Sequence, residues 1–129
     1  MHFVALVILL ALMQYLFFVA MVGKARGQYS ISPPATTGNE MFERIYRVQQ
    51  NTLEQLIIFI PALYLFALYI HALSAAGIGV FFLLGRMVYY RSYIADPASR
   101  GTGMLIGFFA YLVLMIGSLI GIILALVKM

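Results

Sequence analysis

The sequence predicts an all-α integral membrane protein, a bundle of four transmembrane helices. Of the 129 residues, 64% are hydrophobic and only 9% are charged, whereas a soluble domain carries about 25% charged residues. Four apolar segments are each about 20 residues long or longer, which is the length needed to cross a hydrocarbon core of about 30 Å. The basic residues gather on one side of these segments. Together these observations exclude a cytosolic globular fold, a disordered chain and a nucleic-acid-binding module.

The first helix is predicted over about residues 3–22, interrupted only by Gln14, which we expect to form a hydrogen bond between helices. No basic residues precede it, and the apolar run exceeds the roughly 7–15 residues of a secretory signal peptide. We therefore expect a retained helix. A polar loop, 23–41, follows it and contains a proline pair that a helix cannot accommodate. Thr37 followed by Glu40 has the pattern of a capping box, which predicts the start of the second helix.

The other three helices are predicted over about residues 42–71, 74–94 and 102–127, so that the whole chain, 1–129, forms a single membrane domain. The second and third helices are joined by so few residues that they must form a tight hairpin. Small residues four positions apart allow helices to approach closely. The last helix has two such pairs, Gly103 with Gly107 and Gly117 with Gly121.

Charge asymmetry predicts the orientation in the membrane. Seven of the eight basic residues flank the first and third connections: Lys24, Arg26, Arg44, Arg47, Arg86, Arg91 and Arg100. Only Lys128 lies on the opposite side. Basic residues are retained on the cytoplasmic side, so we expect loops 23–41 and 94–103 to be cytoplasmic and both termini to lie outside. A bacterial inner membrane is the expected location.

The second helix carries the first group of candidate site residues. Arg47, Asn51 and Glu54 have the spacing i, i+4, i+7, which places them on one face of a helix. Glu54 lies about 15 Å along the helix from Arg44. An ionised carboxylate near the bilayer centre costs about 2.5–3.5 kcal/mol. Glu54 is therefore expected to face protein, ligand or water, and an ion pair with Arg47 or Arg86 is one open alternative.

A matching group lies on the third helix, where Arg86, Tyr89, Tyr90 and Tyr93 share one face near the same membrane surface. An interfacial aromatic belt is an alternative explanation of the tyrosines. Arginine pairs with carboxylates through two hydrogen bonds. Several arginines with one carboxylate therefore fit a small zwitterion that has more carboxylates than amines, next to apolar walls that admit a lipid-like molecule.

The absence of cysteine excludes disulfides, thiolate metal sites and a cysteine nucleophile. The two histidines, His2 and His71, cannot form a metal site by themselves. We therefore expect no metal cofactor.

Three runs resemble the MAPEG family, the membrane-associated proteins in eicosanoid and glutathione metabolism. They are Ser32–Gly38 (SPPATTG), Phe42–Glu54 (FERIYRVQQNTLE) and Gly85–Tyr93 (GRMVYYRSY), the last followed by Arg100. The resemblance covers nearly the whole chain. It is strongest to the branch that contains leukotriene C4 synthase, microsomal glutathione transferase 2 and the 5-lipoxygenase-activating protein.

This resemblance implies a homotrimer that binds glutathione at subunit interfaces near the cytoplasmic face. The positions that match glutathione contacts are Arg26, Arg47, Gln49, Asn51, Glu54, Arg86, Tyr89 and Tyr93. Arg100 matches the arginine that activates the thiol. A free cysteine thiol has a pKa of about 8.5 and reacts as the thiolate, which a nearby guanidinium stabilises. The implied function is a membrane-embedded glutathione transferase that acts on a hydrophobic electrophile, with reduction of lipid hydroperoxides as a second activity.

Two positions depart from the family pattern: Gly27 stands where the synthase has a second arginine, and Gln55 where it has a tyrosine. A non-enzymatic lipid-binding scaffold of the same family is the main alternative function. A small multidrug exporter with one intramembrane carboxylate is a less favoured alternative, because the arginines near Glu54 suit anionic ligands better than cationic drugs.

Overall fold

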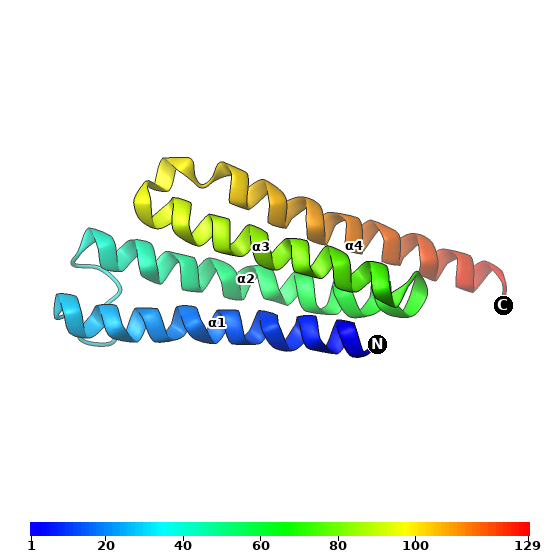
Figure 1. Ribbon diagram of the computed structural model, residues 1–129, viewed down its shortest axis with the longest axis horizontal. Helices are drawn as coiled ribbons and strands as arrows, with labels where there is room; N and C mark the ends of the chain where they lie inside the picture. Colours follow the sequence, from blue (N-terminus) through cyan, green and yellow to red (C-terminus); the bar gives the residue numbers. More distant parts are fainter.

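Four long helices run antiparallel along the length of the molecule in the computed structural model, which describes residues 1–129 (Figure 1). The elements are α1 (His2–Tyr29), α2 (Glu40–Tyr69), α3 (Ala72–Ala95), the short 3-10 helix η1 (Pro97–Ser99) and α4 (Gly101–Val127). Each of the four long helices is long and apolar enough to cross a membrane. The predicted all-α architecture of four long apolar helices is therefore confirmed, and it is consistent with four membrane spans.

The helix α1 extends to Tyr29, seven residues beyond the end predicted from the apolar run. The additional segment contains Lys24, Ala25, Arg26 and Gln28, which are good helix formers and are not interrupted by proline. The helix ends where Ser30 adopts a left-handed conformation with φ 56° and donates its backbone N–H to the Arg26 carbonyl. Hydropathy marks the span, whereas the backbone continues as helix into the polar region.

The capping box predicted for α2 is wrong. The helix begins after Asn39, whose side chain accepts a hydrogen bond from the Phe42 backbone N–H at 3.1 Å. Asparagine is among the best N-cap residues, and it lies immediately before the helix, two residues after Thr37. At the other end of α2 the predicted tight hairpin is confirmed, and His71 caps α3 by accepting from the Ser74 N–H at 3.2 Å.

The core runs between the four helices and is apolar. At its centre Phe59 of α2 stacks on Phe82 of α3, with ring centroids 3.9 Å apart and an interplanar angle of 8°. The expected hydrogen bond of Gln14 is confirmed, because its Nε2 donates to the Leu83 carbonyl of α3 at 3.1 Å. Many large apolar side chains also face outward, as lipid-facing surfaces require.

Small residues bring α4 close to α2 and α3. A Cβ added at Gly103 would lie 2.5 Å from the Tyr89 backbone nitrogen, and one added at Gly117 would overlap the Phe66 ring. At Gly121 the Tyr69 Cβ would be 2.9 Å away. Both predicted glycine pairs therefore contribute to helix packing within the chain.

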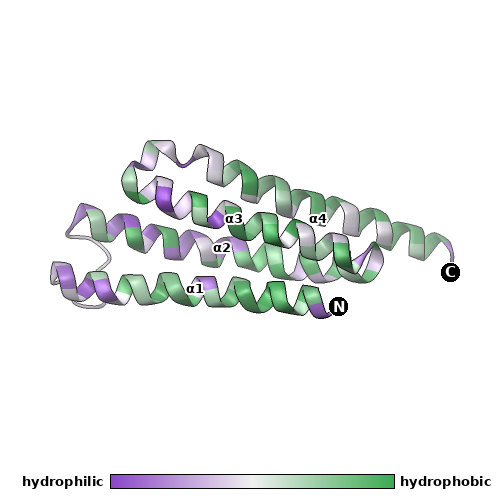
Figure 2. Ribbon diagram, viewed as in Figure 1, coloured by the Kyte–Doolittle hydropathy of each residue, from purple (hydrophilic) through white to green (hydrophobic).

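Hydrophilic residues gather at one end of the bundle, which carries the α1–α2 loop and η1 (Figure 2). The middle and the opposite end, where both termini lie, are mainly hydrophobic, with isolated hydrophilic positions along the helices and at their ends. Arg44 joins α2 to α3 at the hydrophilic end, where it donates to the Ile94 carbonyl at 2.9 Å and pairs with Glu40. The predicted concentration of charge at one end is thus present in the fold.

Candidate functional site

The face of α2 predicted from sequence carries an ion pair. Arg47 and Glu54 lie 3.3 Å apart between Nη1 and Oε1, and their side chains are 48% and 56% exposed. Asn51 lies between them along the helix, with its Oδ1 buried and without a hydrogen-bond partner. The alternative in which Glu54 pairs with Arg47 is the one observed. An ion pair this exposed contributes at most about 1 kcal/mol to stability, so both side chains can exchange partners with a ligand.

Arg86 of α3 lies in a very different environment, because only 2% of its surface is exposed. Its Nη2 donates to Oγ1 of Thr52 at 2.9 Å, and its guanidinium lies over the Tyr89 ring, 4.3 Å from the centroid. Its Nε is buried and has no partner. Arg86 is therefore a buried cation fixed by a neutral hydroxyl and an aromatic ring.

Tyr89 lies between the other two site residues of α3. Its ring stacks on that of Tyr93, with centroids 5.5 Å apart and an interplanar angle of 21°, and the Arg86 guanidinium lies over it. Near the start of α4, Gly103 packs against the Tyr89 backbone. Arg86, Tyr89 and Tyr93 of the predicted set thus form one cluster within a single chain.

Arg100 is held by the turn that precedes α4. It follows η1, which is capped by Asp96 accepting from the Ala98 N–H at 3.1 Å. The Arg100 side chain is exposed, and its Nη1 donates to the Pro97 carbonyl at 2.9 Å. This leaves Nη2 and Nε free of any hydrogen bond within the chain, so the guanidinium can still donate to a ligand.

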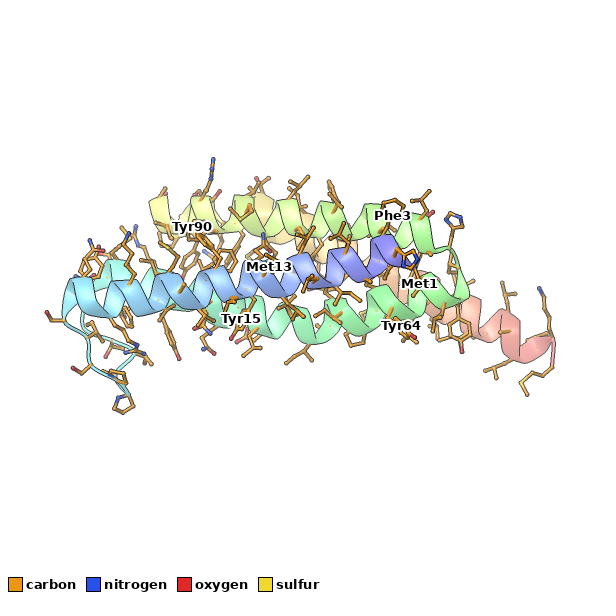
Figure 3. The ribbon with its side chains drawn as sticks, turned by 60° about the horizontal axis from the view of Figure 1, so that its bottom comes forward. Met1, Phe3, Met13, Tyr15, Tyr64 and Tyr90 are labelled. Atoms are coloured by element: carbon orange, nitrogen blue, oxygen red, sulfur yellow. The ribbon has the colours of Figure 1, made fainter.

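Two predicted site residues lie away from this cluster. Gln49 is turned to the opposite face of α2, where its Nε2 donates to the Tyr15 hydroxyl at 2.8 Å. Figure 3 labels Tyr15 about midway along α1. Arg26 holds the α1–α2 loop by donating to the Ala35 carbonyl at 2.7 Å, and it lies over the Phe42 ring. A single chain therefore does not bring Arg26 and Gln49 to the side chains around Arg47.

A cavity of about 330 Å³ lies between α2, α3 and α4 beside the cluster. Its polar wall consists of Asn51, Gln55 and Arg86, and the rest is lined by Met104, Leu105, Phe108 and Tyr111. A larger apolar groove of about 540 Å³ lies between α2 and α4.

The sequence analysis did not identify Thr52 or Tyr15, because each forms its hydrogen bond with a residue 34 positions away on another helix. The only sequence signal that could have singled out Thr52 is its hydroxyl side chain directly after Asn51 on α2.

Comparison with known proteins finds that the MAPEG family model matches residues 4–120. An uncharacterized protein of Synechocystis sp. is 48% identical over 118 residues, which are 92% of this chain and 86% of that protein. Microsomal glutathione S-transferase 2 of Homo sapiens is 38% identical over 99 residues, 77% of this chain and 67% of the transferase. Leukotriene C4 synthase of Bos taurus is 35% identical over 96 residues, 74% of this chain but only 64% of the synthase. The match thus spans just under two thirds of that synthase.

Proposed function

The chain belongs to the MAPEG family of multi-pass membrane proteins, and from that premise we propose that it is a membrane-embedded glutathione transferase. In this proposal the whole chain, 1–129, is one membrane domain. It joins the glutathione thiolate to a hydrophobic electrophile and also reduces lipid hydroperoxides. Relatives named as a glutathione transferase and as leukotriene C4 synthase support this activity.

The observation that carries the proposal is that α2 presents the Arg47–Glu54 ion pair and, between these residues, Asn51, which lines one cavity together with Arg86. Glutathione carries two carboxylates and one ammonium at neutral pH. The guanidinium groups suit the carboxylates, since arginine donates to both oxygens of such a group. Glu54 exchanges part of its pairing with Arg47 for the ammonium. Asn51, Tyr89 and Tyr93 complete the proposed glutathione contacts.

Arg100 is the residue that we propose activates the thiol. A guanidinium stays protonated at physiological pH, so it stabilises the thiolate that attacks the substrate. With an electrophile, a carbon–sulfur bond forms and the leaving group departs with its electron pair, or an epoxide ring opens. With a lipid hydroperoxide, two glutathione molecules are oxidised to the disulfide while the hydroperoxide is reduced to an alcohol and water. Neither reaction requires a metal ion.

A homotrimer accounts for the two site residues that one chain leaves apart. Gln49 faces away from Arg47 on α2, and Arg26 lies at the α1–α2 loop. A glutathione site that uses Arg26 and Gln49 together with Arg47 must therefore combine residues of two subunits. We propose three such sites per trimer, each combining the Arg47 face of one subunit with Arg26 and Gln49 of the next.

The proposed orientation puts segments 23–41 and 94–103, which contain the first and third connections, in the cytoplasm and both termini outside, in a bacterial inner membrane. The charge asymmetry and the cyanobacterial relative support this placement. Because the chain has no cysteine, cysteines introduced singly at Thr36 and at Met129 can be tested with a membrane-impermeant maleimide. The variant at Met129 should react in spheroplasts and the variant at Thr36 only after lysis. The reverse result would contradict the orientation.

Activity is tested with detergent-purified protein. Glutathione binding is measured by calorimetry, and turnover with 1-chloro-2,4-dinitrobenzene and with a lipid hydroperoxide. We expect saturable binding and conjugation. Protein that neither binds glutathione nor reacts with a panel of electrophiles would contradict the proposal. Fatty-acid binding without glutathione binding would instead favour the lipid-binding scaffold, which the apolar groove between α2 and α4 could serve.

A further inference from the structure

Arg86 is a buried cation that no carboxylate of the chain neutralises. The four acidic residues are Glu40, Glu43, Glu54 and Asp96, and the ion pairs in the structure join Glu40 to Arg44 and Glu54 to Arg47. Burying an unpaired charge costs several kcal/mol. A side chain held at such a cost needs strong local support and is well suited to receive an anion.

Thr52 provides the only hydrogen bond that the Arg86 side chain makes. The Thr52 side chain is fully buried, and its hydroxyl donates to the Val48 carbonyl at 2.7 Å, one helical turn earlier. A hydroxyl has one proton and two lone pairs. Because the proton is engaged by the helix backbone, a lone pair of Oγ1 is directed to the Arg86 Nη2, 2.9 Å away. The backbone of α2 thus fixes Thr52 as the acceptor and Arg86 as the donor in this contact.

Tyr89 supports the same guanidinium through its ring, so Arg86 is held by one polar contact and one cation–π contact. This arrangement leaves Nε buried without a partner. Arg86 lines the 330 Å³ cavity together with Asn51, whose Oδ1 is also buried and unpartnered. The cavity is therefore lined by a fixed cation that forms no ion pair with an acidic residue of the chain.

We propose that Thr52 is a positioning residue that sets Arg86 to bind an anionic group of glutathione in this cavity. Thr52 does not touch the ligand and acts only through the Arg86 guanidinium. The ligand supplies the negative charge that the chain itself does not bring to Arg86. This inference rests on the proposed function and adds a residue that was not among the predicted contacts.

The test compares Thr52→Val, which removes the acceptor at nearly constant shape, with Thr52→Ser, which keeps the hydroxyl. A hydrogen bond to a charged group is strong enough that its loss should raise the KM for glutathione about tenfold or more. We expect kcat at saturating glutathione and the KM for the electrophile to stay within about twofold of wild type. Thr52→Ser should restore glutathione affinity although it lacks the methyl group. A residue with only a packing role would show the opposite, with Thr52→Ser impaired and Thr52→Val nearly normal.

A second measurement does not depend on activity. Proton exchange and order of the arginine ¹⁵Nε–H groups are measured by NMR in detergent micelles, with the Arg86 signal identified by its loss in Arg86→Lys. We expect a slowly exchanging, ordered Arg86 signal in wild type and Thr52→Ser, and a mobile one in Thr52→Val. If Thr52→Val does not fold, Thr52→Ala, which lacks both the hydroxyl and the added methyl, takes its place.

The outcomes separate the two proposals. Wild-type protein that does not bind glutathione would overturn the proposed function and this ligand, while the NMR comparison would still decide whether Thr52 positions Arg86. Wild-type protein that binds glutathione, with unchanged KM and unchanged Arg86 order in Thr52→Val, would overturn the role of Thr52 and leave the proposed function standing.

Discussion

Gly103 is the position where one methyl group should most disturb the site. It lies at the start of α4 against the backbone of Tyr89 on α3. An added Cβ would be 2.5 Å from the Tyr89 nitrogen and 2.6 Å from its Cα, about 1 Å inside ordinary van der Waals contact. Backbone atoms of a helix cannot rotate aside as the end of a flexible side chain can. Gly103→Ala must therefore move α4 away from α3.

The expected cost follows from two opposing effects. Overpacking a well-packed contact costs about 1–3 kcal/mol, whereas replacing glycine by alanine in a helix gains up to about 1 kcal/mol. We expect a net loss of about 1–2 kcal/mol in the free energy of unfolding. Tyr89 is displaced by the same movement, so glutathione affinity should fall as well.

The assay is unfolding by sodium dodecyl sulfate in mixed micelles, followed by circular dichroism of the tyrosine side chains. The matched control is Gly101→Ala on the same helix, where an added Cβ would meet no atom within 4 Å. The control should be as stable as wild type or slightly more so. If Gly103→Ala matched this control in stability and in glutathione affinity, the close contact between α3 and α4 at Tyr89 would be refuted.

Two further substitutions test the start of α2 and the ion pair on it. Asn39→Ala removes the acceptor for the Phe42 N–H and should lower the free energy of unfolding by about 1 kcal/mol in the same micelle assay. Thr37→Ala should have almost no effect, and equal losses in both variants would argue against Asn39 as the cap. Glu54→Gln should change stability by less than about 1 kcal/mol, because its pairing with Arg47 is half-exposed. It should weaken glutathione binding in calorimetry about tenfold through the lost ammonium contact, and a variant with unaltered affinity would exclude that contact.

Much of the architecture could be predicted because it depends on local sequence. Long, mainly apolar runs indicated the four helices, and the short connection at His71 indicated the hairpin. The spacing of Arg47, Asn51 and Glu54 was enough to place them on one helix face, where Arg47 and Glu54 do pair. A polar residue in an apolar helix, Gln14, indicated a contact with another helix.

The remaining features depend on which of two candidate cap residues is used or on contacts between residues far apart in the sequence. Thr37 and Asn39 are both residue types that favour the N-cap position. The helix begins at Glu40, so Asn39 occupies the N-cap and accepts the hydrogen bond. The burial of Arg86 against Thr52 joins positions 34 apart on different helices, which no periodicity reveals. Likewise, Gln49 lies only two residues from Arg47 but faces Tyr15 on α1.

The central claim is that this chain holds glutathione as the thiolate. The most direct test is the ultraviolet difference absorbance of the thiolate when glutathione is added to purified wild-type protein and to Arg100→Ala at neutral pH. We expect a saturable thiolate signal in wild type and a much weaker one in Arg100→Ala, with calorimetry showing that the variant still binds glutathione. Glutathione bound to wild-type protein without a thiolate signal would contradict the claim, and an undiminished signal in Arg100→Ala would show that another group activates the thiol.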